Sequence, residues 1–154
     1  KLILSGRKLN ESMGGYIGKQ TLKLVTEENL KFRNIRIALL GFAFKDNIPD
    51  IRNTKIIQII NYFKKLKINV DIFDPIVVKS EVRKLYKINI KDFNKIETNK
   101  YDVIVLAVSH DVFLKKINYY SKFYKNKNKK IFIDEKNNYS STKLKKENFN
   151  FFQM

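Results

Sequence analysis

Two apolar segments, IRIALLGF at residues 35–42 and YDVIVLAV at residues 101–108, decide the fold class of this chain. Each is short, rich in β-branched residues and almost free of charge, which is typical of a strand buried on both faces of a parallel sheet. The segments INVDIFD at 68–74 and KKIFIDEK at 129–136 resemble them closely enough to complete a set of four predicted strands.

Helical patterns precede and separate these strands. Apolar residues at steps of four predict a first helix from Arg7 to about Leu30. Strands that alternate with helices form βαβ units, whose right-handed crossovers produce a parallel sheet. We therefore predict an α/β fold, a three-layer sandwich with a Rossmann-like parallel sheet, preceded by a long N-terminal helix. Further helices are expected over three segments: after an N-cap at Asn53 or Thr54, over residues 79–86, and over residues 111–124.

The first predicted helix contains a pair of glycines, Gly14 and Gly15. Each costs a helix ~1 kcal/mol relative to alanine, so their presence calls for a reason. Two interpretations are open: the glycines permit the backbone of another element to approach closely, or they kink or break the helix.

Composition limits the kinds of site that this chain can supply. The 154 residues are 44% hydrophobic, which is enough for one domain with a real core. The absence of cysteine excludes disulfides and a thiol nucleophile from this chain, and the single histidine, His110, excludes a multi-histidine metal cluster. We expect no metal site, and we expect a soluble, cytoplasmic protein without a signal peptide or a membrane span.

The chain is strongly basic, with 32 Lys and Arg residues against 15 Asp and Glu and a net charge of +17. Most of the positive charge is lysine, scattered among many Ile and Asn residues, as in proteins from AT-rich genomes. We attribute the charge to this composition and consider a nucleic-acid partner unlikely. The alternative is a stand-alone basic α/β module that binds nucleotides or nucleic acid.

Ligands of open parallel sheets bind outside the carboxyl ends of the strands. The loop FKDNIPDIR, residues 44–52, follows the first predicted strand and carries Lys45 and Arg52 close to the start of the next helix. A lysine, an arginine and a helix N-terminus together predict a phosphate site, with a solvated basic loop as the alternative. Three further loops end at the same edge: Asp74-Pro75, Ser109–Asp111 and Asp134–Asn137.

Other features of these loops favour structural roles. No GxGxxG follows any predicted strand, so the usual glycine-rich grip on a dinucleotide is absent from this sequence. The pair His110 and Asp111 is more typical of a helix cap than of acid–base catalysis, and Asp74 before Pro75 is more typical of a turn.

Several motifs together resemble a known family. LLGFAFKDNIPDIRNTKIIQII (39–60), VDIFDP (70–75) and YDVIVLAVSHDVF (101–113) resemble the C-terminal domain of the UDP-glucose/GDP-mannose dehydrogenase family. GRKLNESMGGYIGKQTLKLV (6–25) is similar to the end of that family's central dimerisation helix. The resemblance covers roughly residues 3–139 and is nearest to the branch that acts on UDP-N-acetylhexosamines.

The resemblance implies an activity for the complete enzyme. Such enzymes oxidise the sugar C6 alcohol to a carboxylate in two NAD-dependent steps, for precursors of surface polysaccharides. A separate Rossmann domain holds NAD, a catalytic cysteine precedes the central helix, and the C-terminal domain holds the UDP moiety. This sequence contains neither the cysteine nor the dinucleotide fingerprint. We therefore expect a fragment that needs the remainder of the dehydrogenase, with no catalytic residue of its own.

The resemblance also implies roles for four residues of the loops. Phe44 and Lys45 match the family's Phe-Lys pair, in which the lysine meets the phosphates of the nucleotide sugar. Arg52 matches an arginine that reaches the cofactor side of the cleft. Lys136 stands where relatives have a basic residue near the nucleotide.

The ends of the chain complete the comparison with the family. Arg7 and Asn10 match a helix motif that faces the subunit interface and the substrate, so we expect a homodimer through the first helix. The closing residues ENFNFFQM lack the arginine-containing motif of many relatives. We divide the chain into the end of the dimerisation helix, a UDP-sugar-binding α/β domain and a poorly ordered tail, at residues 1–31, 32–139 and 140–154.

Overall fold

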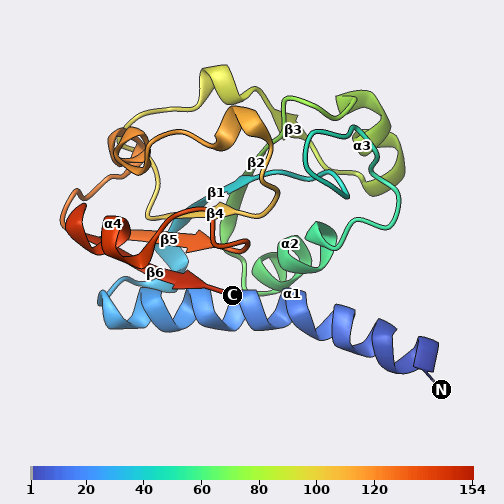
Figure 1. The fold of residues 1–154 in the computed structure, drawn as a ribbon, viewed down its shortest axis with the longest axis horizontal. Helices are drawn as coiled ribbons and strands as arrows, with labels where there is room; N and C mark the ends of the chain where they lie inside the picture. Colours follow the sequence, from blue (N-terminus) through green and yellow to red (C-terminus); the bar gives the residue numbers. More distant parts are fainter. Residues whose placement is uncertain (1) are drawn as a thin grey trace.

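The computed structural model describes residues 2–154, with side chains from Met13 onward. Its centre is a sheet of six strands, all parallel, in the order β3-β2-β1-β4-β5-β6 (Figure 1). The strands are β1 (Arg36–Leu40), β2 (Asn69–Phe73), β3 (Ile90–Lys91), β4 (Val103–Leu106), β5 (Lys130–Asp134) and β6 (Phe149–Gln153). The four predicted strands and the predicted parallel α/β fold are confirmed.

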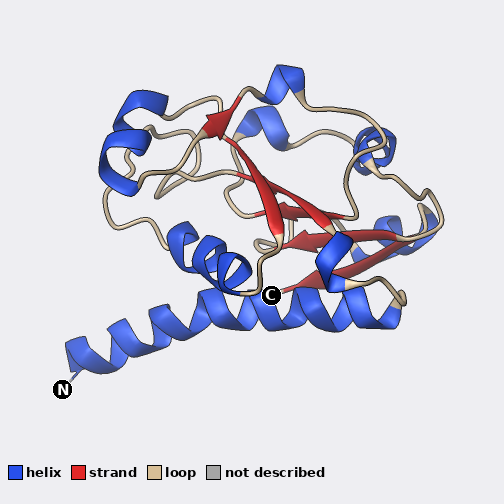
Figure 2. Ribbon diagram, turned by 180° about the vertical axis from the view of Figure 1, so that it is seen from behind, coloured by secondary structure: helices blue, strands red, loops and turns tan. Residues whose placement is uncertain are grey.

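Helices cover both faces of this sheet (Figure 2). The α-helices are α1 (Leu2–Glu27), α2 (Ile56–Lys65), α3 (Lys79–Tyr86) and α4 (Ser141–Lys146). Four 3₁₀ segments add to them: η1 (Phe32–Asn34), η2 (Phe93–Lys95), η3 (Asp111–Phe113) and η4 (Ile117–Phe123). Within the described chain, none of the helices combines the length and the hydropathy needed to cross a membrane.

Alternation along the strands builds two cores. Ile37 and Leu39 of β1 pack into one core with α1 and α2, while Ala38 and Leu40 pack into the other with η3, η4 and α4. Both sets of side chains are fully buried, as expected for a central parallel strand. The result is the predicted three-layer sandwich.

The segment 111–124 differs from its prediction as one helix. It forms η3 and η4, separated at Leu114, whose φ of −80° and ψ of 58° are not helical. The buried residues of η4 are Ile117, Tyr120 and Phe123. A spacing of three places them on one face of a helix with three residues per turn, so burial of these side chains favours the 3₁₀ form.

Helix α1 decides between the two interpretations of its glycines. It is continuous and packs along α2 and β6 (Figure 1). A Cβ atom at Gly14 would lie 2.6 Å from Cβ of Gln58, and one at Gly18 would lie 2.2 Å from the ring of Tyr62. Gly15 faces open space. Close approach is therefore the reason for Gly14, and Gly18 shares that role without having been predicted.

The expected disorder after residue 139 is wrong. Ser140 caps α4 by accepting a hydrogen bond from the backbone N–H of Lys143 at 3.2 Å, and β6 pairs with β5 along five residues. Leu144 and Phe149 are buried in the second core. The abundance of Lys and Asn concealed an edge strand whose apolar side chains pack on both faces of the sheet. The short edge strand β3 was also missed.

Candidate functional site

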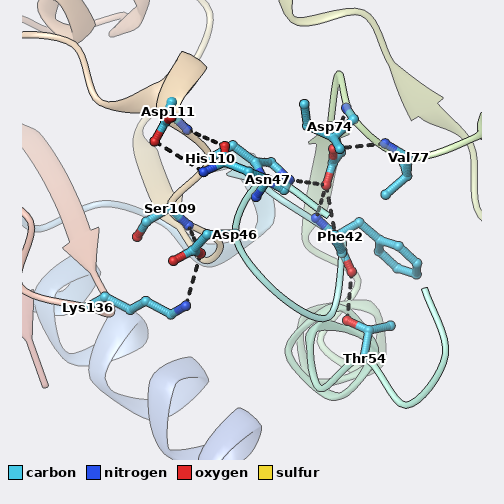
Figure 3. Close-up of polar contacts among 12 residues, drawn as sticks. Phe42, Asp46, Asn47, Thr54, Asp74, Val77, Ser109, His110, Asp111 and Lys136 are labelled. Carbon is cyan, nitrogen blue, oxygen red and sulfur yellow. Dashed lines mark hydrogen bonds and ion pairs between the residues drawn. The ribbon is translucent and has the colours of Figure 1, made fainter. Parts of the chain in front are cut away.

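The candidate site lies at the carboxyl edge of the sheet, between β1 and β4. The chain crosses from one half of the sheet to the other there, and ligands of doubly wound sheets bind at this position. The loops after β1, β4 and β5, residues 41–55, 107–111 and 135–139, approach one another at this edge (Figure 3).

The first two loops cross closely at Gly41. Its φ of +102° is in a region that favours glycine, and a Cβ atom there would lie 2.4 Å from Cβ of Val108. The N–H groups of Ala107 and Val108 both donate to the Leu40 carbonyl, at 2.9 and 3.2 Å. Only glycine fits this crossing, which brings the loop after β1 against the loop after β4.

Asp74, at the end of β2, organises the start of the loop after β1. Its Oδ2 accepts hydrogen bonds from the backbone N–H groups of Phe42 at 2.8 Å and Ala43 at 3.1 Å. Its Oδ1 accepts from those of Ile76 at 2.8 Å and Val77 at 3.3 Å. The predicted turn role of Asp74 is therefore present, but the same buried carboxylate also fixes a second loop.

His110 joins this carboxylate to the next part of the loop. Its Nε2 lies 2.9 Å from Asp74 Oδ2, and its Nδ1 accepts the backbone N–H of Asn47 at 2.8 Å. An N–H group can only donate, so Nδ1 is unprotonated and the proton of the neutral ring sits on Nε2. Burial opposes ionisation of Asp74, but hydrogen bonds from His110 and the backbone outweigh it and lower the pKa of Asp74.

The position of His110 differs from the predicted cap. It occupies the N-cap position of η3, yet its side chain makes no capping hydrogen bond. The ring is fully buried and packs against Phe113, with ring centroids 5.6 Å apart. A buried ring with both nitrogens occupied is not a general acid or base for a ligand in solvent.

Asn47 and Asp46 fasten the same loop to the loop after β4. The Asn47 side chain donates to Asp111 Oδ1 at 3.2 Å and accepts the backbone N–H of Asp111 at 2.9 Å. Asp46 Oδ1 accepts the backbone N–H of Ser109 at 2.8 Å and the ammonium of Lys136 at 3.0 Å. Burial raises the pKa of Asp46, but these bonds outweigh it and the net shift is downward.

Three of the predicted site residues, Phe44, Lys45 and Lys136, lie on loops that Asp46 joins. Lys136 reaches from the end of β5 to Asp46, the neighbour of Lys45 (Figure 3). Lys45 is exposed and has no ion-pair partner among residues 13–154, and its ammonium lies 5.9 Å from the centroid of the exposed Phe44 ring. Within residues 13–154, Lys45 is therefore a cation without a carboxylate partner, on a loop whose backbone is held on both sides.

Arg52 has a partner of its own. Its Nε lies 3.1 Å from Asp50 Oδ1 and its second guanidinium nitrogen lies 3.1 Å from Asp50 Oδ2, while the Arg52 side chain is 82% exposed. The hydrogen bonds between the two raise the pKa of Arg52 and lower that of Asp50. Arg52 thus lies on the predicted loop, and its guanidinium forms an ion pair with Asp50.

Thr54, one of the two caps predicted for α2, accepts a backbone N–H of the first turn and also ties this end of the loop to the residues that follow β1. The N-cap position is Lys55, and Thr54 Oγ1 donates to the Phe42 carbonyl at 2.7 Å. The same oxygen accepts the N–H of Ile56 at 3.3 Å. Thr54 therefore closes the far end of the loop onto its beginning. The side chains of Arg7 and Asn10 lie outside the described residues.

The last loop adds contacts that the sequence did not indicate. Buried Asp134 accepts from the side chains of Asn138 at 2.8 Å and Gln153 at 2.9 Å. Asn138 also donates to Ser109 Oγ at 2.9 Å, which joins the loops after β4 and β5. Burial raises the pKa of Glu135, and unlike at Asp46 and Asp74 this effect is not outweighed by hydrogen bonds, so the net shift is upward. No group of residues that could hold a metal ion is present in the described side chains.

The sequence of this chain is similar to those of known proteins. Residues 38–141 match the UDP binding domain of the UDP-glucose/GDP-mannose dehydrogenase family. The chain belongs to this family. The UDP-N-acetyl-D-glucosamine 6-dehydrogenase of Salmonella typhi is 40% identical over 113 residues, and that of Pseudomonas aeruginosa is 35% identical over the same length. Each alignment covers 73% of this chain and 26% of the relative, so the chain spans about a quarter of those proteins.

Solved structures show that the fold extends over the whole chain. The NDP-N-acetyl-D-galactosaminuronic acid dehydrogenase of Methanosarcina mazei aligns with 99% of this chain at a TM-score of 0.86 and 22% identity. The UDP-D-ManNAc dehydrogenase of Pyrococcus horikoshii aligns with 96% at a TM-score of 0.76 and 23% identity. The alignments cover 31% and 32% of those chains. The similarity includes α1 as well as α4 and β6, so all three belong to the shared architecture.

Proposed function

We propose that this chain is the nucleotide-sugar-binding part of an NAD-dependent UDP-sugar 6-dehydrogenase, and that the diphosphate of the nucleotide sugar binds at Lys45. The observation that carries the proposal is the ammonium of Lys45, which has no ion-pair partner among residues 13–154 and lies at the switch point of the sheet, on a loop anchored before and after it. A lysine held there offers a point charge to phosphate oxygens.

The neighbouring residues supply the remaining contacts. Lys136 is the second cation of the site and is held by Asp46 at 3.0 Å, so it is already oriented toward the loop of Lys45. The exposed ring of Phe44 offers an apolar surface to the ribose or the base. Arg52 lies on the same loop, and we assign it to the cofactor side of the cleft.

The cofactor itself needs other parts of the enzyme. NAD accepts the hydride in dehydrogenases of this kind, but the described loops do not fit its pyrophosphate, because the turn after β1 contains only Gly41 where a dinucleotide site has several glycines. The chain also contains no cysteine. We therefore assign NAD binding and the oxidation to the remainder of the dehydrogenase, and we expect the 154-residue chain alone to produce no NADH.

We further propose that the chain forms a homodimer through α1. Met13, Gly15, Tyr16 and Lys19 line a surface hollow on this helix, and Tyr16 is 45% exposed. An exposed aromatic beside a glycine with open space is a suitable surface for a second helix. The cytoplasmic location expected from the sequence is part of the same proposal.

Calorimetric titration of UDP into the chain tests the phosphate site. A charge-assisted hydrogen bond contributes ~1.5–3 kcal/mol, so Lys45→Ala should weaken UDP binding by roughly ten- to a hundredfold. Lys65→Ala is the matched control, because Lys65 is an exposed lysine at the last turn of α2, and this helix begins at the carboxyl edge and runs away from it. Equal UDP affinities for the two variants would refute the site.

A further inference from the structure

We propose that His110 is a positioning residue for this site: its neutral imidazole, through Nδ1, holds the backbone of Asn47 and thereby the position of Lys45. The inference rests on the proposed function, since it concerns how the phosphate-binding lysine is presented. Phe42 and Ala43 stand before Lys45 in the loop and Asn47 stands after it.

Both flanks of Lys45 depend on the same pair of side chains. Asp74 Oδ2 accepts hydrogen bonds from the N–H groups of Phe42 and Ala43, and it also accepts one from Nε2–H of His110. The opposite ring nitrogen receives the N–H of Asn47 at 2.8 Å. One carboxylate and one ring therefore form a continuous connection from the end of β2 through the ring to the far side of the lysine.

Because His110 is buried, it acts by holding the loop and not by contacting the ligand. His110 has no exposed surface, so a ligand at Lys45 cannot touch it. The other contacts of Asn47, between its side-chain amide and Asp111, are exposed to water, which competes for such bonds. The Asn47 N–H to Nδ1 bond is the more protected of the anchors on that residue.

Two substitutions separate the two nitrogens. The Oδ1 of asparagine takes the place of Nδ1, so His110→Asn keeps an acceptor for Asn47 and loses the donor to Asp74. The Nε2 of glutamine takes the place of the ring Nε2, so His110→Gln keeps the donor and loses the acceptor. We expect His110→Gln to weaken UDP binding roughly tenfold and His110→Asn to change it by less than about twofold.

Thermal unfolding of the same variants shows whether the effect is merely structural. Asp74 is the more buried partner, so we expect His110→Asn to have the lower melting temperature of the two variants, although it binds UDP better. A purely structural role predicts that affinity and melting temperature fall together. That result, or equal UDP binding by both variants, would overturn the positioning role.

A through-hydrogen-bond coupling between the Asn47 amide nitrogen and His110 Nδ1, measured by NMR on the wild-type chain, checks the bond directly. We expect the coupling to be present, and to persist in Lys45→Ala although UDP binding falls. Its absence in the wild type overturns the inference. If the wild type does not bind UDP at all, the proposed function fails and this inference with it, whereas wild-type binding that both variants retain refutes this inference alone.

Discussion

Asp71 and Asp74 lie three residues apart on β2 and its following loop, yet they are held in different ways. Asp71 is partly exposed and pairs with the ammonium groups of Lys91 at 2.8 Å and Lys100 at 3.3 Å, and with the hydroxyl of Tyr101 at 2.7 Å. Asp74 is fully buried and receives four backbone N–H groups and one imidazole.

The difference shows what each carboxylate does for the molecule. The partners of Asp71 are side-chain groups at the ends of long or aromatic side chains, so this cluster joins elements without fixing the path of a loop. Backbone N–H groups have only one position in a given loop conformation, so Asp74 specifies that conformation. Asp74 holds the start of the loop that carries Lys45, and the comparison predicts that the shape of this loop depends on Asp74.

The largest expected effect is the loss of the buried carboxylate. Asp74→Ala leaves several N–H groups without an acceptor, and we expect the free energy of unfolding to fall by about 3–4 kcal/mol. Asp71→Ala is the matched variant: Lys91 can be hydrated, Lys100 keeps Glu97, and only the Tyr101 hydroxyl loses its acceptor, so we expect a smaller loss of about 1–2 kcal/mol. Urea denaturation measures both values. Equal losses would remove the distinction between the two clusters.

The effect of intermediate size is the pH dependence of stability that the Asp74 carboxylate causes. Burial raises the pKa of Asp74, but its hydrogen bonds outweigh that effect and the folded-state pKa is lowered. A lowered pKa stabilises the fold above the unfolded value of ~3.9, and this contribution is lost as the pH falls through the folded-state value.

We therefore expect the stability difference between the wild type and Asp74→Asn to be constant from about pH 7 to pH 5 and to shrink below about pH 4. Urea titrations at several pH values measure the difference. If the difference in unfolding free energy stayed unchanged in strong acid, ionised Asp74 would not be the form that accepts the backbone N–H groups.

The smallest expected effect concerns salt. Screening at 1 M salt shortens the Debye length to ~3 Å, which weakens exposed ion pairs more than buried hydrogen bonds. The stability difference between wild type and Asp71→Ala should fall by a few tenths of a kcal/mol, while that for Asp74→Ala stays constant. Equal sensitivity to sodium chloride at the two positions would contradict the comparison.

The sequence predicted the parts of this molecule that local patterns encode. The apolar composition of segments 35–42 and 101–108 is enough to predict that they are buried strands. The sheet edge that holds Lys45 follows from their order along the chain. The loops that meet at that edge were likewise predictable, because parallel strands end on the same side.

The remaining features depend on partners that are distant in the chain. The bonds from His110 to Asp74 and to Asn47 span 36 and 63 residues, so no local pattern shows that the ring points inward. The strand at 149–153, FNFFQ, follows a segment rich in Lys and acquires its role only by pairing with β5. The crossing at Gly41 also requires Val108, which belongs to another strand connection.

The central claim, that nucleotide phosphates bind at the loop of Lys45, can be tested by NMR titration of UDP into the ¹⁵N-labelled chain. We expect saturable chemical-shift changes that are largest in the loops after β1, β4 and β5, at residues 41–47, 107–111 and 135–139, and that are lost in Lys45→Ala. Saturable changes centred elsewhere on the chain, or unchanged in Lys45→Ala, would contradict it.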